Sequence, residues 1–274
     1  AGAVASYTIE AMMGDCRALQ AGTSHFLGQN FARAFDIKFL DENNELQYAW
    51  TTSWGVSTRM VGAVVMVHGD DQGLILPPKL APIQAVVVPI WKSDEERARV
   101  LEAASRVEAL LRDSVRVRVD SREGLSPGWK FNDWEMRGVP LRIEIGPRDV
   151  QYEQVTLARR DVPGREGKST VPLAGLVGVV QETLATIQAD LYRRALDFRE
   201  AHTCDPKDYA EFRQAVDEGF AYSWWCGDPT CEAQIKEDTK ATVRCIPLEQ
   251  EPGKGRCIYC GKDATERAIF GQAY

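Results

Sequence analysis

Apolar and polar residues alternate along residues 1–13, which read AGAVASYTIEAMM. Alternation with a period of two is typical of a β-strand that buries one face. Further strand-like runs, FDIKFL and LQYAWTTSW, occur with one helical pattern between residues 35 and 67. The segment HGDDQGLILPPKLAP is then rich in turn formers and prolines, which predicts a domain boundary near residues 78–82.

A strand, helix, strand order follows this boundary, from IQAVVVPI through a helical segment to VRVRV. Ser93 and Glu96 have the spacing of a capping box, which predicts the start of the helix. The apolar residues of this helix recur at helical spacing and are Val100, Leu101, Ala104, Val107 and Leu111. VPLRIEIG at 139–146 and EQVTLARR at 153–160 predict two more strands. The order is that of an α/β domain with a mixed sheet.

A long helix is predicted from about Leu176. Its apolar stripe contains Val180, Leu184, Ile187, Leu191 and Phe198. Asp205 and Pro206 predict the N-cap and first turn of another helix, which should end at Gly219. Beyond Tyr222 the chain contains five cysteines and many polar turns. This segment has too little apolar material for an independent core without a covalent or metal staple.

Length and charge narrow the class of protein. The 274 residues exceed the roughly 100–200 of an average domain, so we expect two or three domains. A net charge of -7 argues against a protein that coats nucleic acid through bulk electrostatics, but it permits a local basic patch. The absence of a ~20-residue apolar stretch and of a basic n-region predicts a soluble, cytoplasmic protein.

The cysteine pattern suits a reducing compartment with one local metal site. Two pairs, with four and two intervening residues, predict a structural zinc site whose ligands are Cys226, Cys231, Cys257 and Cys260. Gly227 and Gly261, which follow Cys226 and Cys260, would relax the backbone in those turns. Cys245 could replace one ligand. The alternatives are ordinary buried thiols or a site that has lost its metal.

The segment TSWGVSTR at 52–59 places a glycine and hydroxyl residues where a strand meets a helix. Free backbone N–H groups at a helix N-terminus attract phosphate, and Arg59 would add a charged fork. A purely structural turn with a solvated surface arginine is the alternative interpretation.

GTSHFLGQNF at 22–31, the Ser-Trp-Gly turn and HGDDQGLILPP at 68–78 occur in this order. Together they resemble the active-site signatures of class II prolyl-tRNA synthetases, and the chain is similar to the C-terminal part of that family. The resemblance implies an aminoacyl-tRNA ligase that uses ATP and Mg²⁺ to convert L-proline into prolyl-adenylate. The prolyl group would then pass to tRNA(Pro). It also implies a homodimer.

The resemblance assigns roles to individual residues. The ATP contacts would be Gln20, Thr23, Ser57, Thr58 and Arg59. The proline pocket would contain His25, Trp54 and Gly55, with Arg59 and His25 as the catalytic pair. From KFNDWEMRGVPLRIEIGPRD at 130–149, the residues that hold anticodon guanines would be Glu135, Arg142 and Arg148. A hydrogen-bonded core histidine and salt bridges on a solvated sheet face are the alternatives. Residues that could meet tRNA phosphates are Arg116, Arg118, Arg122, Arg159, Arg160 and Lys168.

The implied fold class is α/β and α+β multidomain. Residues 1–80 would form the end of an antiparallel-sheet catalytic domain, 81–190 an α/β anticodon-binding domain, and 191–274 a linker helix and a small zinc-binding α+β domain. The family's dimer motif and second motif are not visible, so this segment alone is expected to be inactive. The alternatives are a threonyl- or glycyl-type class II synthetase and a non-catalytic tRNA-binding, synthetase-like fragment.

Overall fold

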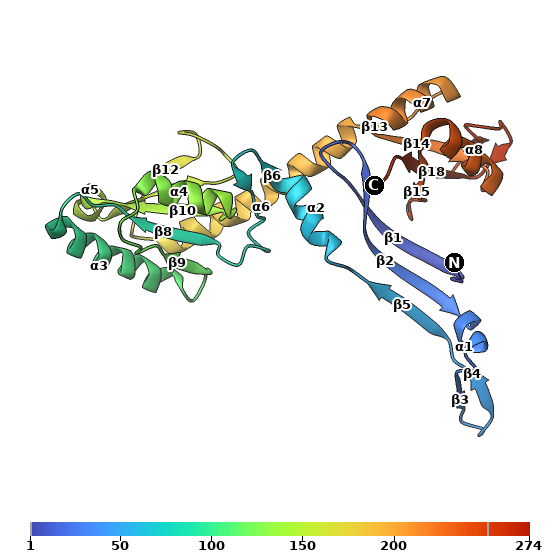
Figure 1. Ribbon diagram of the computed structural model, residues 1–274, viewed down its shortest axis with the longest axis horizontal. Helices are drawn as coiled ribbons and strands as arrows, with labels where there is room; N and C mark the ends of the chain where they lie inside the picture. Colours follow the sequence, from blue (N-terminus) through green and yellow to red (C-terminus); the bar gives the residue numbers. More distant parts are fainter. Residues whose placement is uncertain (1, 251) are drawn as a thin grey trace. The chain divides into compact units, whose positions relative to one another are not determined.

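The computed structural model describes residues 2–250 and 252–274 (Figure 1). The chain divides into two compact units. Unit 1 combines Ala1–Val67 with Asp197–Tyr274, and unit 2 is His68–Leu196. Each unit mixes helices with sheets, so the protein is an α/β multidomain chain, as the sequence predicts. Within the part of the chain that is described, no helix is long and apolar enough to span a bilayer.

The N-terminal part of unit 1 is built on a three-stranded antiparallel sheet in the order β1-β2-β5. Its elements are β1 (Ala5–Met12), β2 (Ala18–Gly28), α1 (Asn30–Ala34), β3 (Lys38–Leu40), β4 (Leu46–Tyr48), β5 (Thr51–Gly55) and α2 (Arg59–His68). The strands β3 and β4 form a separate hairpin. Helix α2 starts four residues after the sheet strand β5 ends, which leaves a short turn between them.

The C-terminal part of unit 1 is a four-stranded sheet in the order β13-β14-β18-β15. Its elements are β13 (Thr203–Cys204), α7 (Tyr209–Glu218), β14 (Phe220–Trp225), α8 (Pro229–Thr239), β15 (Thr242–Cys245), β16 (Gly255–Arg256), β17 (Asp263–Ala264) and β18 (Glu266–Gly271). Phe212 of α7 and Phe270 of β18 are fully buried and meet edge to face. They anchor a small apolar core with Ile235 of α8.

These two parts of unit 1 pack against each other. Met12 and Ala18, at the turn between β1 and β2, share a small apolar cluster with Phe220. The Ala18 N–H donates to the carbonyl of Gln272 at 2.8 Å. The Tyr274 hydroxyl donates to Asp15 in the same turn at 2.6 Å. The end of the chain is thereby fixed along the start of β2.

Unit 2 contains a five-stranded mixed sheet in the order β12-β11-β10-β8-β9. Its elements are β6 (Gly69–Asp70), β7 (Gly73–Leu74), β8 (Ala85–Pro89), α3 (Asp94–Leu111), β9 (Val117–Val119), α4 (Pro127–Met136), β10 (Leu141–Ile145), α5 (Pro147–Gln151), β11 (Gln154–Arg159), β12 (Lys168–Pro172) and α6 (Leu176–Ala201), whose last turn from Asp197 belongs to unit 1. The strand β8 is parallel to both β9 and β10. This confirms the predicted strand, helix, strand order.

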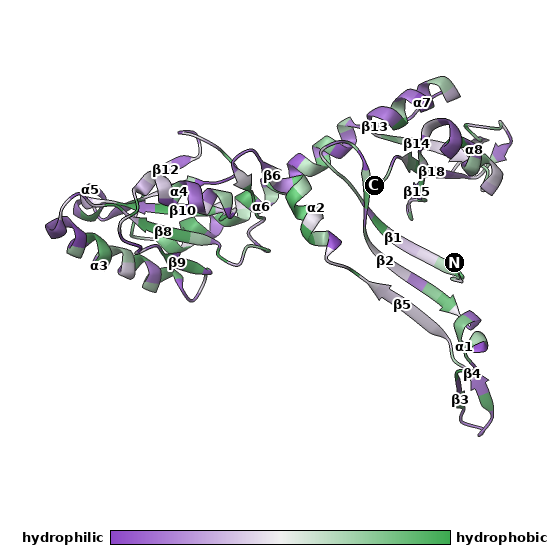
Figure 2. Cartoon of the chain, in the orientation of Figure 1, coloured by the Kyte–Doolittle hydropathy of each residue, from purple (hydrophilic) through white to green (hydrophobic). Residues whose placement is uncertain are grey.

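Both faces of β8 are buried, which explains its continuous apolar run (Figure 2). Ala85 and Val87 face the core formed with α3 and α6, and Val86 and Val88 pack with Trp134 of α4 on the other face. The Ser93 hydroxyl accepts from the Glu96 N–H at 3.3 Å, which confirms the predicted cap. The buried stripe of α6 from Val180 to Leu191 is also as predicted.

Two boundaries differ from the sequence expectations. Helix α7 begins at Tyr209 and not near Pro206, because Asp208, rather than Asp205, accepts from the N–H groups of the first turn. Residues 68–80 pack with unit 2, although the sequence suggested a boundary near residues 78–82. Here Gly73 approaches α4 so closely that a Cβ would lie 2.4 Å from the Met136 Cα.

Candidate functional site

A cleft of about 330 Å³ lies beside β2, β5 and the start of α2 in unit 1. Its lining residues are Gln20, Ala21, Gly22, Thr23, His25, Ser53, Trp54, Gly55, Val56, Ser57 and Arg59. Every residue predicted to contact ATP or proline is in this set except Thr58. The structure therefore brings the predicted residues into one cleft, and their individual roles stay predictions.

The register of β1 and β2 explains how the polar residues of this cleft align. Glu10 pairs with Gln20 and Thr8 with Thr23, and the register shifts by one residue between these pairs. Paired residues of an antiparallel sheet project from the same face. The β-bulge at the shift therefore places Gln20 on the same face as Thr23, which simple alternation would not do.

Arg59 is held where the helix α2 begins. Its Nη1 donates to the backbone carbonyl of Gln20 at 3.1 Å, and its backbone N–H donates to the Ser57 hydroxyl at 3.3 Å. A guanidinium carries five N–H donors, so one anchored group leaves the others for a ligand. The backbone N–H groups of Arg59, Met60 and Val61 donate to Ser57 and Thr58, so the guanidinium is the group at this turn that is suited to an anion such as phosphate.

His25 and Trp54 lie farther along the same strands. The His25 Nδ1 is 2.8 Å from the Ser6 hydroxyl on β1, an exposed contact and not a core hydrogen bond. Trp54 pairs with Ser24 rather than with His25, and 79% of its surface is exposed. By this pairing the Trp54 side chain projects from the face of the sheet opposite to His25, and the place of both residues in one proline pocket stays a prediction.

A second cleft, of about 400 Å³, lies in unit 2. Glu135 and Arg142 both line it, and Arg142 Nη1 donates to Glu135 at 2.5 Å. Arg142 also donates to Glu144, and its guanidinium lies 4.0 Å from the Phe131 ring centroid. Lys168, which pairs with Glu144 at 2.8 Å, lies at the edge of the cleft. Phe131 is not among the residues that line the cleft, which therefore offers a base charged side chains and not a stacking ring.

Arg148 is not part of this second cleft. It lies on α5 and lines a different cavity with Glu96 and Arg99 of α3. The structure therefore separates Arg148 from Glu135 and Arg142, which the resemblance grouped together. Phe131 contacts Arg142 from outside the cleft, and no sequence pattern indicates this contact.

Most of the basic residues that were candidates for phosphate contact are engaged within unit 2. Arg116 donates to backbone carbonyls, whereas Arg122, Arg159, Arg160 and Lys168 pair with carboxylates. Arg160, for example, binds both oxygens of Asp70. Neutralised pairs attract phosphate less than free cations do.

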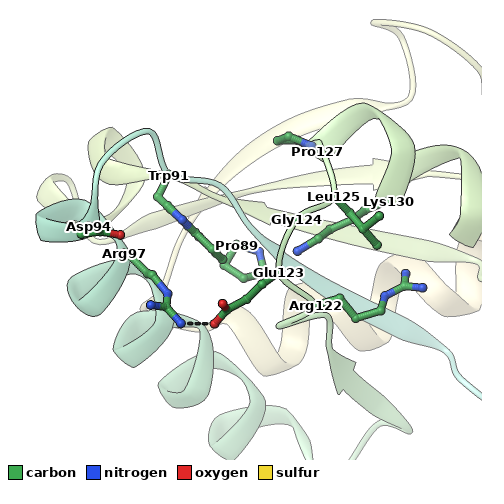
Figure 3. Close-up of a pocket in the computed structure, with 10 residues that line it drawn as sticks. All are labelled: Pro89, Trp91, Asp94, Arg97, Arg122, Glu123, Gly124, Leu125, Pro127 and Lys130. Atoms are coloured by element: carbon green, nitrogen blue, oxygen red, sulfur yellow. Dashed lines mark hydrogen bonds and ion pairs between the residues drawn. The ribbon is translucent and has the colours of Figure 1, made fainter.

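A third cavity, of about 250 Å³, lies where β8, α3 and the β9–α4 loop meet (Figure 3). Trp91 and Lys130 extend into it, and Arg97 pairs with Glu123 at its rim. Lys130 is 2% exposed and donates to the Asp120 carbonyl at 3.1 Å. Burial lowers the pKa of Lys130. No sequence pattern indicates this cavity, because its lining comes from separate segments of the chain.

The Asp120 carboxylate beside this cavity is fully buried. Burial raises the pKa of Asp120, but hydrogen bonds from Arg122 at 2.7 and 2.9 Å and from the Trp134 indole at 2.8 Å outweigh it. The pKa falls to about 2. Since an unfolded aspartate titrates near ~3.9, this stabilisation is present above about pH 4 and is lost as the pH falls towards 2.

Replacing Asp120 with asparagine should lower the free energy of unfolding at pH 7 by about 3 kcal/mol, because Arg122 and Lys130 would lose a buried counterion. It should also flatten the decline in stability between pH 4 and pH 2. Urea titrations followed by tryptophan fluorescence at several pH values measure both effects. An unchanged acid slope in the variant would contradict the assignment.

The four predicted metal ligands form one cluster in the C-terminal part of unit 1. The Sγ atoms of Cys226, Cys231, Cys257 and Cys260 all lie within 4.8 Å of one another. The Cys226 Sγ lies 3.7 Å from that of Cys231 and 3.8 Å from that of Cys260. Four thiolates at ~2.3 Å from a tetrahedral zinc ion would lie roughly 3.8 Å apart. The donor set therefore fits zinc.

The turns around the cluster also match the expectation. Gly227 and Gly261 adopt φ values of 75° and 69°, in the left-handed region that glycine tolerates best. The backbone N–H of Lys262 lowers the pKa of Cys260 to about 7. Cys245 lies outside the group, on β15. All seven cysteines are free thiols, which excludes a disulfide framework in the described chain.

Two segments of the chain match known protein families. Residues 84–183 match the family described as "Anticodon binding domain", and residues 209–274 match "Prolyl-tRNA synthetase, C-terminal". The first match covers the sheet of unit 2, including the Glu135–Arg142 cleft. The second covers the cysteine cluster.

Curated relatives align with the whole chain. It is 58% identical over 273 residues to a "Proline--tRNA ligase" of Chloroflexus aurantiacus and to one of Roseiflexus castenholzii, and covers 57% of each. It is 54% identical over 279 residues to "Proline--tRNA ligase, chloroplastic/mitochondrial" of Arabidopsis thaliana, of which it covers 51%. The chain thus spans little more than half the length of these relatives.

Proposed function

Because this chain belongs to the prolyl-tRNA synthetase family, we propose that it is the C-terminal portion of a ligase that charges tRNA(Pro) with proline. The observation that supports this proposal most strongly is the cleft beside β2, β5 and α2, which gathers the predicted ATP and proline contacts. Identity of 58% to proline ligases favours this activity over threonyl- or glycyl-type charging. Residues 1–80 would supply part of the catalytic domain, with 68–80 packed on unit 2. Residues 81–190 would form the anticodon-binding domain, and 191–274 a linker helix and the zinc-binding domain.

The first step would be attack of the proline carboxylate on the α-phosphorus of ATP, which forms prolyl-adenylate and releases pyrophosphate. A ribose hydroxyl at the tRNA 3′ end would then take the prolyl group. Arg59 would neutralise charge on the α-phosphate while Ser57 and Thr58 hold the nucleotide. The remaining wall of the site would come from sequence found in the longer relatives. ATP would bring the Mg²⁺ ions.

Gln20 and Thr23 would complete the nucleotide wall, and His25, Trp54 and Gly55 the proline pocket. Neither step needs a covalent enzyme nucleophile, so the cleft would act through positioning. This is consistent with its content, since the lining includes three hydroxyl residues, one amide and one guanidinium but no cysteine. The protein would work as a homodimer in the cytoplasm, where its seven free thiols remain reduced.

The proposed activity is tested by ATP–pyrophosphate exchange with the full-length protein that contains this chain, run with each amino acid. We expect exchange with proline at a rate at least about a hundred-fold above that with threonine or glycine. Exchange with threonine but not proline would refute the assignment. Absence of exchange with all three would instead favour a non-catalytic tRNA-binding protein.

We further propose that the Glu135–Arg142 cleft reads the anticodon guanines. A carboxylate can accept from guanine N1 and N2, and an arginine can donate to O6 and N7. The existing pair between Glu135 and Arg142 keeps both groups ordered before tRNA binds. Arg148 would contact a different part of the anticodon stem-loop, since it lines another cavity.

Replacing Glu135 with glutamine should raise the KM for tRNA(Pro) about 10- to 100-fold, because one base-edge contact is worth ~1–3 kcal/mol. ATP–pyrophosphate exchange should be unchanged, since it needs no tRNA. The matched control is Arg106→Ala, which removes an exposed charge from α3. An equal loss in exchange and in charging would indicate a folding defect and contradict anticodon reading by Glu135.

A further inference from the structure

A continuous hydrogen-bonded chain connects the C-terminal part of unit 1 to the nucleotide wall of the cleft. It begins at Arg244 on β15, 234 residues beyond its partner Glu10 on β1. Arg244 Nε and Nη2 donate to one oxygen of Glu10 at 3.1 and 2.8 Å. Arg244 Nη1 donates to the Thr242 hydroxyl at 3.1 Å, so the guanidinium is fixed at all three nitrogens.

The second oxygen of Glu10 continues the chain. The Thr8 hydroxyl donates to Glu10 Oε1 at 2.9 Å and accepts from Gln20 Nε2 at 3.3 Å. A hydroxyl has one proton, and its shorter contact is to the charged carboxylate, so the Gln20 amide must donate to Thr8. The Gln20 backbone carbonyl in turn accepts from Arg59. Arg244 is thus linked to Arg59 through three intervening residues.

Burial makes the first link of this chain strong. The Glu10 side chain is 5% exposed and that of Arg244 is 15% exposed. A charge-assisted pair at this depth holds its geometry, and removing one partner leaves the other charge without compensation. A carboxylate that accepts from Thr8 also polarises that hydroxyl, which strengthens the next bond to Gln20.

The link lies beside an apolar contact between the same two parts. Met12 and Ala18 pack with Phe220, so the turn of β1 and β2 is already docked on the C-terminal sheet. The Glu10–Arg244 pair fixes the orientation of β1 within this contact. It does so at Glu10, the residue of β1 that pairs with Gln20. It lies where the β-bulge sets which face Gln20 occupies.

We propose that Arg244 is a positioning residue for the nucleotide wall, which it orders through Glu10, Thr8 and Gln20. The inference rests on the proposed function, since it names the ATP side of that same cleft. His25 hydrogen-bonds to Ser6 and not to this chain. Loss of Arg244 should therefore weaken ATP binding and leave proline binding largely unchanged.

The test measures KM for ATP and for proline in pyrophosphate exchange with the full-length protein. Arg244→Met should raise the KM for ATP about ten-fold, which is within the range of measured couplings between linked residues. The KM for proline should change less than about two-fold. Arg244→Lys, which keeps the charge but has a single donor nitrogen, should recover part of the loss. Arg213→Ala, which removes an exposed arginine from α7, should match the wild type.

Thr8→Val tests the middle of the chain without removing a charge. It should reproduce the rise in ATP KM, and the double variant Arg244→Met with Thr8→Val should be no worse than the more impaired single variant. Additive effects, or equal rises in both KM values, would overturn the inference. Should Arg244→Met fail to fold, Thr8→Val alone must raise the ATP KM. If the wild type shows proline-dependent exchange and the variants have the same KM for ATP, only this inference is refuted. If the wild type shows no exchange with proline, the proposed function is refuted.

Discussion

Alanine in place of Arg59 should reduce the rate of proline-dependent ATP–pyrophosphate exchange about 100- to 1,000-fold, because the cleft would lose its preorganised cation for the α-phosphate. Arg59 is exposed at the start of α2, and its guanidinium has one described protein partner, the Gln20 carbonyl. The fold should therefore be little affected. Exchange rates at saturating ATP and proline measure the effect.

Two further variants sharpen this prediction. Arg59→Lys keeps the charge but loses the forked donors, so it should recover only part of the rate. Arg33→Ala removes an exposed arginine from α1, outside the cleft, and should retain full exchange. A normal rate in Arg59→Ala would mean that the charge at the phosphate is neutralised by other groups.

The second large effect is expected at the cysteine cluster. Cys257→Ser should reduce bound zinc from one to less than ~0.1 equivalent per chain and unfold the C-terminal part of unit 1, because structural zinc can supply ~10 kcal/mol of folding free energy. Cys257 is buried within the cluster. Elemental analysis and limited proteolysis of the purified protein measure the two outcomes.

Cys245→Ser is the matched control, since this half-buried thiol lies on β15 outside the cluster. It should keep a full equivalent of zinc and resist the protease. A strong chelator should convert the wild type to the protease-sensitive state of Cys257→Ser. Retention of zinc by Cys257→Ser and its loss from Cys245→Ser would reverse the ligand assignment.

Local patterns were sufficient to predict much of the fold. The capping residue Ser93, the stripe from Val180 to Leu191 and the continuous apolar run of β8 all depend on neighbours within a few residues. The predicted start of α7 was wrong because CDPKD contains two aspartates, each of which could cap the N-terminus of the helix. Only the folded chain shows that Asp208 faces the free N–H groups.

The cleft residues could be predicted by resemblance to a family, because the signatures that carry them are short and ordered along the chain. Contacts without a local signature were missed. Arg244 and Glu10 are separated by 234 residues, and nothing near either one indicates its partner. Arg148 follows Arg142 closely in sequence, yet it belongs to α5 and lines another cavity.

The discontinuous composition of unit 1 has a consequence for biosynthesis. At ~5–20 residues per second, a ribosome adds Arg244 roughly 10–50 s after Glu10. Unit 2, whose residues are contiguous, can fold during this interval. Until then the surface of β1 and β2 that contacts the C-terminal part stays exposed on the nascent chain, where it is prone to aggregation and open to chaperone binding.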